Sequence, residues 1–456
     1  MEKGILLHHG GEKITLYSLD SLFRQLICLV AFCVFLCNMF WISNKTPLFV
    51  LGACGAASFF LRVPSRFQNA MLPFVIFFLY KVVSDVFLFP ESSGAVMHRP
   101  MCAAFLGGIA VQYVFRDRDS TFLVCLLAGI TLMAVIVFPA SFLTNATESL
   151  FHHGDRLMIL FNHPNGLAAA SATGAITALC FLLSRPMRLS RAVGVIPRMF
   201  VRLGNSAPFL WSTLAICVVM LWLTASRTSF YVTVPVFVLL VFPRAASFFA
   251  ARKRIAVALL VAAAVLAVPI LSVNKNRIAD SRMGGVFVHG PQGETSFRSR
   301  MPGWESALAA FSERPWLGNG PESFAGTHAV YMRQNYERLV GELGETMVQT
   351  DTLVLPHAHN QYLMELSEHG IIGLVLFLLL FAVPFWKAIK HRTLYGACIP
   401  VLAFFLFLGV LEAPFYGSRS ASFAITAVFM ILGYLSSIRH DTLGSTEPQP
   451  EPVRAS

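Results

Sequence analysis

Long apolar stretches, each about the length needed to cross a bilayer, recur along almost the whole chain and limit its possible folds. One transmembrane helix needs about 20 mostly apolar residues. The chain has 456 residues, and only 13% of them are charged, against roughly 25% in soluble domains. The sequence therefore predicts an all-α polytopic membrane protein with about 12 transmembrane helices. The expected spans are 22–42, 46–62, 69–90, 100–115, 121–143, 165–184, 207–224, 229–249, 255–273, 361–384, 393–412 and 419–438.

The distribution of basic residues predicts how these helices are oriented. If the N-terminus is cytoplasmic, Arg and Lys accumulate in cytoplasmic segments, such as the one with Arg185, Arg188 and Arg191, whereas each short outer segment has about one. This asymmetry is the positive-inside pattern. We therefore expect cytoplasmic N- and C-termini and membrane lipids as partners. The positive-inside pattern then explains the net charge of +11, which does not indicate binding to nucleic acid.

One loop is much longer than the others. Residues 274–360 separate the ninth and tenth expected spans and fall on the outer face. Long loops without secondary structure are uncommon, and Met301–Glu313 is helix-like with a proline near its start, so we expect a partly helical loop domain. The predicted regions are 1–273 with helices 1–9, 274–360 as the loop, 361–438 with helices 10–12, and 439–456 as a disordered cytoplasmic tail.

The cysteines of the chain give little sign of a metal site. All nine cysteines lie in apolar segments without a zinc-binding spacing, so we predict no metal site and no cofactor.

Lys81 and Asp85 lie four residues apart within the third span. Ionisable residues inside a membrane normally face the bundle interior. We favour an ion pair between them over contact with a cavity.

Several polar residues from separate segments fall near the outer membrane boundary. Arg227 lies in a short hairpin, on the side of the membrane where positive charge is disfavoured. We therefore favour a functional role for Arg227 over the alternative that its side chain only extends to the lipid headgroups. Taken alone, Arg300 fits a surface arginine of a soluble loop better. Arg156 and His163 precede the sixth span, and His163 could instead cap that helix.

The strongest candidates lie where the loop enters the tenth span. His357, His359 and Asn360 are clustered there. A histidine can accept a proton near neutral pH, and at this position it would meet both a lipid-linked and a water-borne substrate. Either histidine could be the base, and the alternative is that both only cap the helix.

These residues resemble the signature of a known family. His359-Asn360, nine residues, Gly370, two residues and Gly373 match the His-Asn-x9-Gly-x-x-Gly pattern of bacterial O-antigen ligases. The superfamily also includes O-antigen polymerases and protein O-oligosaccharyltransferases. The resemblance covers roughly residues 150–380. It extends to Ser226-Arg227, Arg300 to Gly320, and Arg156 with Asn162 to Gly166.

The resemblance implies a reaction on the periplasmic face of a bacterial inner membrane. A glycan would pass from undecaprenyl diphosphate to a sugar hydroxyl of lipid A-core, with inversion and without a metal. His359 would be the general base, and Arg227 and Arg300 would bind the diphosphate, since guanidinium groups pair well with phosphate oxygens. Gly370 and Gly373 would permit close packing or a bend. Further candidates for substrate binding are Arg156, His163, His357 and Asn360.

Three alternatives remain at this stage. A polymerase would use a second lipid-linked repeat as acceptor, and a protein O-oligosaccharyltransferase would use a protein. Members of the latter group often have a longer C-terminal region, which favours the ligase. A transporter or flippase would also have many helices, but it predicts repeated halves and charges in the middle of spans rather than a long outer loop.

Overall fold

The computed structural model describes residues 6–9, 12–39, 50, 53, 72–89, 104–112, 121–143, 151–152, 156–157, 164–183, 195–224, 226–251, 298–345, 348, 355–390, 397–416 and 419–437. Among these, regular structure is helical apart from two short antiparallel hairpins, which were not predicted. The hairpins are β1 (Leu6–His9) with β2 (Glu12–Thr15), and β3 (Phe151–His152) with β4 (Arg156–Leu157). The prediction of a helical membrane protein is confirmed at this level.

Most of the described helices follow the apolar segments of the sequence. The helices are α1 (Leu16–Met39), α3 (Leu72–Val83), the π-helix η2 (Ser84–Leu88), α5 (Thr121–Leu143), α6 (Pro164–Leu183), α7 (Val195–Gly204), α8 (Ala207–Leu223), α9 (Arg227–Ala251), α14 (Met301–Glu313), α15 (Phe324–Gln334), α16 (Tyr336–Leu343), α18 (Gln361–Lys390), α19 (Cys398–Leu411) and α20 (Arg419–Ser437). Of these, α7 and α14 to α16 lie outside the expected spans. The expected span 255–273 and the tail 439–456 lie outside the described residues, as does 46–62 except for residues 50 and 53.

Two described helices are long and apolar enough to cross a membrane, α6 over Asn165–Leu183 and α18 over Gln361–Lys390. Helices α7 and α8 would add a third span if counted together, but they are bent by 75°. Ser206 caps α8 at this bend, since its hydroxyl accepts a hydrogen bond from the amide of Phe209. Because other apolar helices, such as α19, are shorter than a full crossing, the number of about 12 spans stays a prediction.

Helix α6 packs against α5, α8, α9, α19 and α20 and is buried along most of its length. Small residues allow this close approach. A Cβ atom added to Gly174 would lie 2.7 Å from Sγ of Cys217 in α8. The hydroxyls of Thr173 and Thr177 donate to the carbonyls four residues earlier, so α6 buries them with their hydrogen bonds made. Helix α6 is therefore a fixed support for residues at its N-terminal end.

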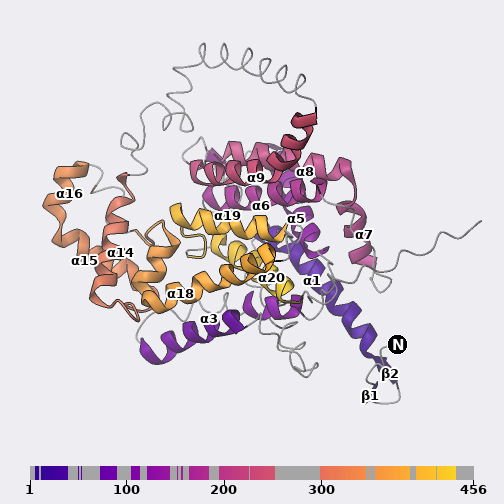
Figure 1. The fold of residues 1–456 in the computed structure, drawn as a ribbon, viewed down its shortest axis with the longest axis horizontal. Coiled ribbons are helices and arrows are strands. Elements are labelled where there is room, and N and C mark those ends of the chain that lie inside the picture. The colour runs from indigo at the N-terminus through magenta and orange to yellow at the C-terminus, as the bar shows by residue number, and fades with distance from the viewer. Residues whose placement is uncertain are drawn as a thin grey trace, which may run out of the picture.

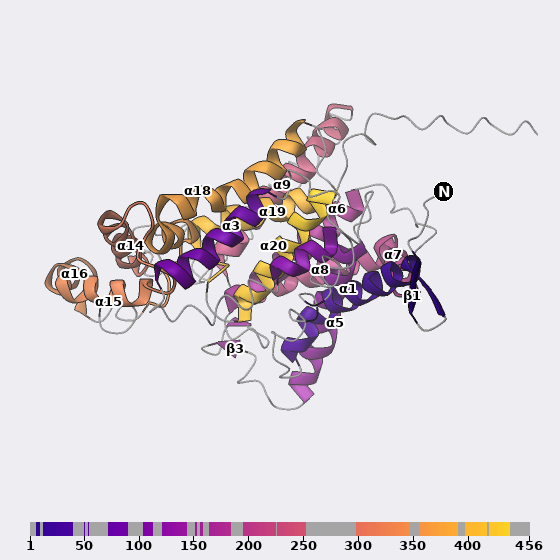
Figure 2. The same cartoon turned by 90° about the horizontal axis from the view of Figure 1, so that it is seen from below.

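Helices α14, α15 and α16 lie together at one end of the molecule, away from α1, α5 and α7 (Figures 1 and 2). Helix α14 coincides with the helix predicted at Met301–Glu313, and Pro302 stands in its first turn. The long loop is thus helical in its described part. The bounds of the loop domain, and the side of the membrane on which it lies, stay predictions.

Two glycines join this lobe to α18. Helix α18 bends at Gly370, where φ is 63°, and Gly318 has a φ of 71°. A Cβ atom on Gly370 would lie 2.4 Å from the carbonyl carbon of Trp316, and one on Gly318 would lie 2.3 Å from that of Glu368. A Cβ atom on Gly373 would likewise overlap a neighbouring side chain. The predicted bend is confirmed at Gly370, which also packs closely against the backbone of Trp316.

Candidate functional site

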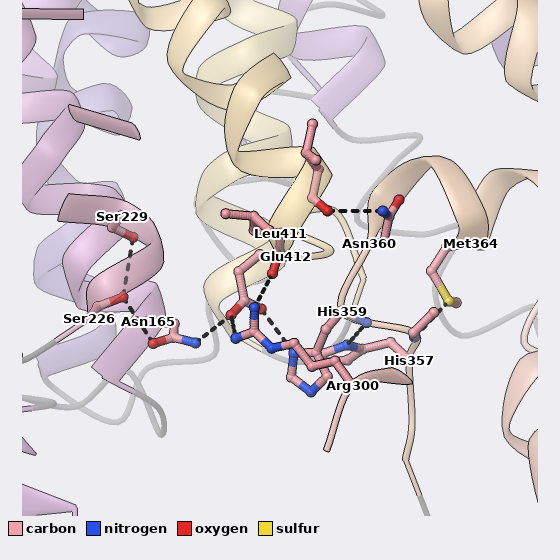
Figure 3. A network of polar contacts seen from close by, with 12 residues as sticks. Asn165, Ser226, Ser229, Arg300, His357, His359, Asn360, Met364, Leu411 and Glu412 are labelled. Atoms are coloured by element: carbon pink, nitrogen blue, oxygen red, sulfur yellow. Dashed lines mark hydrogen bonds and ion pairs between the residues drawn. The ribbon is translucent and has the colours of Figure 1, made fainter. Parts of the chain in front are cut away.

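Residues from several helix ends meet around the carboxylate of Glu412 (Figure 3). Glu412 directly follows the last residue of α19 and is buried. Its Oε1 atom accepts hydrogen bonds from Arg300 Nη2 at 2.7 Å and from Asn165 Nδ2 at 2.8 Å. Its Oε2 atom lies 3.1 Å from Nδ1 of His359. One carboxylate therefore joins three segments that are far apart in the sequence.

Arg300 stands immediately before α14 and points its guanidinium at the end of α19. While Nη2 pairs with Glu412, Nη1 donates to the carbonyl of Leu411 at 2.6 Å. The last carbonyls of a helix have no partner within the helix, and a positive charge is favourable there. The Arg300 side chain is only 14% exposed. It is thus a fixed and largely buried group, and not the surface arginine that its own segment, taken alone, suggested.

His359 is held just outside α18 by its neighbours. Asn360 caps the helix, because its Oδ1 atom accepts hydrogen bonds from the amides of Tyr362 and Leu363, both at 3.0 Å. His359 itself has a positive φ of 50°, which is unusual for a residue with a side chain. The rings of His357 and His359 are 4.3 Å apart. Asn360, rather than either histidine, therefore supplies the cap of α18.

The charges around Glu412 keep it ionised. Arg300 Nη2 lies 2.7 Å from Oε1 of Glu412, and a positive charge at this distance favours the charged form of a buried carboxylate. A carboxylate bound to one nitrogen of a histidine fixes the orientation of the ring and favours its protonated form during proton transfer. The other nitrogen of His359, Nε2, is then the one available to a substrate.

A chain of hydrogen bonds continues from Glu412 to the start of α9. Asn165, in the first turn of α6, accepts a hydrogen bond from Ser226 Oγ at 3.0 Å, and Ser226 also contacts Ser229 (Figure 3). Arg227 is the first residue of α9 and directly follows Ser226. Among the predicted residues, Arg227 therefore adjoins the network only through its sequence neighbour Ser226. The structure brings four others together directly: Arg300, His357, His359 and Asn360.

The two predicted residues ahead of α6 are described less fully. The backbone of Arg156 belongs to β4, which lies close to α6 and α8, but its side chain is outside the described residues. His163 also lies outside them. The roles of Arg156 and His163 therefore stay predictions.

Of the helices that the structure describes, four begin at this network: α6, α9, α14 and α18. Helix N-termini carry partial positive charge and unpaired amides, and they favour anions. Among the described residues, no group of three or more His, Cys, Asp or Glu side chains could hold a metal ion. The helix ends and Arg300 together make the surroundings of Glu412 favourable for negative charge.

Sequence reasoning did not assign a role to Glu412 or Asn165. Glu412 ends an apolar stretch, and an ionisable residue at that place is a functional candidate in its own right. Asn165 stood in the quoted segment before α6 but had no assigned partner. Their meeting depends on the packing of α6 against α19, which no local pattern reports.

A second polar cluster lies deeper, between α3 and α18. Lys81 Nζ lies 2.7 Å from Glu365 Oε2 and 3.0 Å from His369 Nδ1, and all three side chains are buried. These residues also line a cavity whose walls are mainly aromatic and aliphatic. Contact with a cavity, the less favoured of the two predicted alternatives for Lys81, is confirmed, and Lys81 forms an ion pair with Glu365 of α18.

A comparison with protein families matches residues 211–378 to the family described as O-antigen ligase. The matched region runs from α8 to beyond the bend of α18 and contains Arg227, Arg300 and His359. Asn165 and Glu412 lie outside it, one on either side. A search of curated proteins found no match.

Proposed function

Because the match over residues 211–378 makes this chain a member of the O-antigen ligase/polymerase superfamily, we propose that it is an O-antigen ligase. It transfers a glycan from undecaprenyl diphosphate to a sugar hydroxyl of lipid A-core. The observation that carries this proposal is the single network in which Glu412 binds both Arg300 and His359. Such a network offers a base and an anion-binding group side by side.

In this proposal His359 is the general base. Glu412 holds the Nδ1 side of the ring, so Nε2 accepts the proton of the acceptor hydroxyl as that oxygen attacks the sugar. A well-placed general base contributes typically 10²–10⁴-fold. Glu412 stays ionised and stabilises the imidazolium that forms. His357 packs against the same ring and supports its orientation.

Arg300 and Arg227 bind the diphosphate of the donor. Arg300 is already fixed beside Glu412, so little side-chain entropy is lost when a phosphate arrives. Arg227 is supplied from the start of α9, next to the Ser226–Asn165 hydrogen bond. The N-termini of the four helices add partial positive charge. Arg156 and His163 are proposed as further donor contacts, and Asn360 as the residue that fixes the helix start.

The chemical step is a displacement at the anomeric carbon of the donor. The acceptor oxygen forms a bond to this carbon from one face, while the bond to the diphosphate oxygen breaks on the other, which inverts the centre. The electron pair leaves with undecaprenyl diphosphate, whose growing negative charge the arginines stabilise. His359 takes the proton of the hydroxyl and later releases it to water.

The proposed topology follows from the positive-inside pattern. About 12 helices cross a bacterial inner membrane, both termini are cytoplasmic, and residues 274–360 form a periplasmic loop. Arg300 precedes α14 within this loop and His359 stands at its end. The site then lies at the membrane surface, where a polyprenyl chain stays in lipid while its diphosphate meets arginine.

Transfer by the purified full-length protein tests the proposal. Undecaprenyl-diphosphate-linked glycan is supplied with lipid A-core, a second lipid-linked repeat or a peptide as acceptor. A ligase transfers glycan to lipid A-core and releases undecaprenyl diphosphate in equal amount. Transfer to the repeat would instead identify a polymerase, and transfer to the peptide a protein O-oligosaccharyltransferase. If the donor is moved across vesicles without any transfer, a flippase replaces the proposal.

A further inference from the structure

Gln361, the first residue of α18, connects the site to the interior of the protein. Its side chain is fully buried. Its backbone amide donates to the carbonyl of Glu412 at 3.1 Å, and its Oε1 atom accepts a hydrogen bond from the amide of Phe415 at 3.2 Å. Gln361 therefore holds the segment 412–415 at both ends. This segment presents the Glu412 carboxylate to His359.

The other end of the Gln361 amide points to the buried ion pair. Gln361 Nε2 donates to Glu365 Oε1 at 3.3 Å, while Glu365 Oε2 pairs with Lys81 Nζ at 2.7 Å. An ionised carboxylate can only accept hydrogen bonds, and a side-chain amide has one donating and one accepting end. Glu365 therefore makes the donating end of Gln361 face inward, which leaves the accepting oxygen for the amide of Phe415.

Helix α3 supports this arrangement from outside α18. Lys81 belongs to α3, which runs beside α18 in both views (Figures 1 and 2). Tyr80, its neighbour, donates a hydrogen bond to the carbonyl of His369 at 2.7 Å, at the bend of α18. The first turns of α18 are thus fixed on one side by α3 and on the other by the segment that follows α19.

We propose that Glu365 and Gln361 are positioning residues for His359. Glu365, held by Lys81, orients the amide of Gln361, and Gln361 fixes the 412–415 segment so that Glu412 meets Nδ1 of His359. The kinetic consequence rests on the function proposed above. A shift of about 1 Å at a catalytic group can lower a rate by about 10²-fold. We expect kcat to depend on this chain of contacts while the KM for the donor does not.

Two double variants separate positioning from structural support. Both remove the buried ion pair, but only one keeps a hydrogen-bond acceptor for Gln361. In Lys81→Met with Glu365→Gln, the new amide oxygen still accepts from Gln361 Nε2. In Lys81→Met with Glu365→Leu, no acceptor remains. We expect the Gln variant to keep kcat within about threefold, and the Leu variant to lose roughly 10- to 100-fold in kcat at an unchanged donor KM.

A second pair keeps Lys81 and Glu365 in place if the double variants do not fold. Gln361→Met removes both side-chain hydrogen bonds at similar volume. Tyr362→Phe is its matched control, because it removes a hydrogen bond from the next residue of the same turn, to the carbonyl of Leu406. We expect a loss of kcat in the Gln361 variant only.

Hydrogen–deuterium exchange gives a readout that does not depend on the reaction. The Phe415 amide should exchange faster in the Leu double variant and in Gln361→Met, and at the normal rate in the Gln double variant. The positioning role would be overturned if the two double variants had equal kcat values and equal exchange rates. If the double variants do not fold, the same result for Gln361→Met and Tyr362→Phe would overturn it. If the wild-type protein transfers no glycan, the proposed function fails, while the exchange result still decides the contacts of Gln361.

Discussion

The Nδ1 atom of His359 lies 3.1 Å from the Oε2 atom of Glu412, a residue 53 positions further along the chain. His359 stands in left-handed backbone beside the cap of α18, and Glu412 stands just after α19. The Arg300 guanidinium, 2.7 Å from Oε1 of Glu412, favours the charged form of this carboxylate. The two residues thus form a histidine–carboxylate pair across the ends of two helices, with Arg300 on the other carboxylate oxygen.

Glu412→Gln should lower the rate of transfer with little change in shape. The amide still fills the site, but it no longer offers a charge to an imidazolium that forms on His359. We expect kcat to fall by roughly 10²–10⁴-fold. Initial rates with the lipid-linked donor measure the change, and Glu313→Gln at the exposed end of α14 is the control. A Glu412→Gln protein that works within twofold of wild type would contradict the pairing.

Arg300→Lys should weaken donor binding although it keeps the positive charge. One ammonium group cannot replace a planar fork that reaches both Leu411 and Glu412. Losing a charged hydrogen bond costs about 1.5–3 kcal/mol, so we expect the donor KM to rise by roughly 10- to 100-fold. The exposed residue Arg338 provides the control, as Arg338→Lys. Equal KM values in the two variants would remove Arg300 from the diphosphate site.

Gly370→Ala should destabilise the protein. The residue has a positive φ, and an added Cβ atom would lie 2.4 Å from the backbone of Trp316. A side chain in such backbone costs about 1–3 kcal/mol before any overlap is counted. Gly326→Ala in α15 is the matched control, because nothing lies within 4 Å of its added Cβ atom. Thermal unfolding in detergent should show a lower Tm for the first variant alone.

The lobe of α14, α15 and α16 should lose stability in acid. Burial raises the pKa of Glu305, but hydrogen bonds from Arg338 and Tyr331 outweigh this effect, so the pKa lies below its ordinary value of 4.5. A carboxyl group whose pKa is lowered by folding stabilises the fold above pH 4.5. This contribution is lost as the pH falls through the pKa of the folded state. Because Glu305 is 34% and Arg338 41% exposed, the effect is modest.

Hydrogen–deuterium exchange of the backbone amides of residues 301–343 measures this loss of stability, once the rates are corrected for the intrinsic pH dependence of amide exchange. Protection should be constant from pH 7 to 5 and should decline below 4.5. In Glu305→Gln the decline should be smaller, while Glu313→Gln should behave as the wild type. An identical acid profile in Glu305→Gln and the wild type would show that the ion pair does not stabilise the lobe.

Much of the fold could be predicted because it depends on local pattern. Apolar runs of bilayer length predicted the helices, and a proline near its start predicted α14. Signature spacing found His359, and the bend at Gly370 followed from a glycine in that spacing. Each of these features depends on residues that are close in the sequence.

The partners of the site residues could not be predicted in this way. Taken without the family resemblance, Arg300 suggested a surface arginine, because nothing in its own segment shows that α19 ends against it. Glu412 and Asn165 meet only when α6 packs against α19. Similarly, the spacing of Lys81 and Asp85 suggested a pair within one helix, whereas the structure adds an ion pair with Glu365 of α18. Contacts between distant segments need the packed structure.

The most direct test of the central claim is a single-turnover transfer assay with His359→Gln and His357→Gln. Both variants keep a polar side chain, and donor binding is measured in parallel. If His359 is the base, His359→Gln should transfer roughly 10²–10⁴-fold more slowly at unchanged donor affinity, whereas His357→Gln should stay within about tenfold of wild type. Transfer by His359→Gln at nearly the wild-type rate would contradict the account.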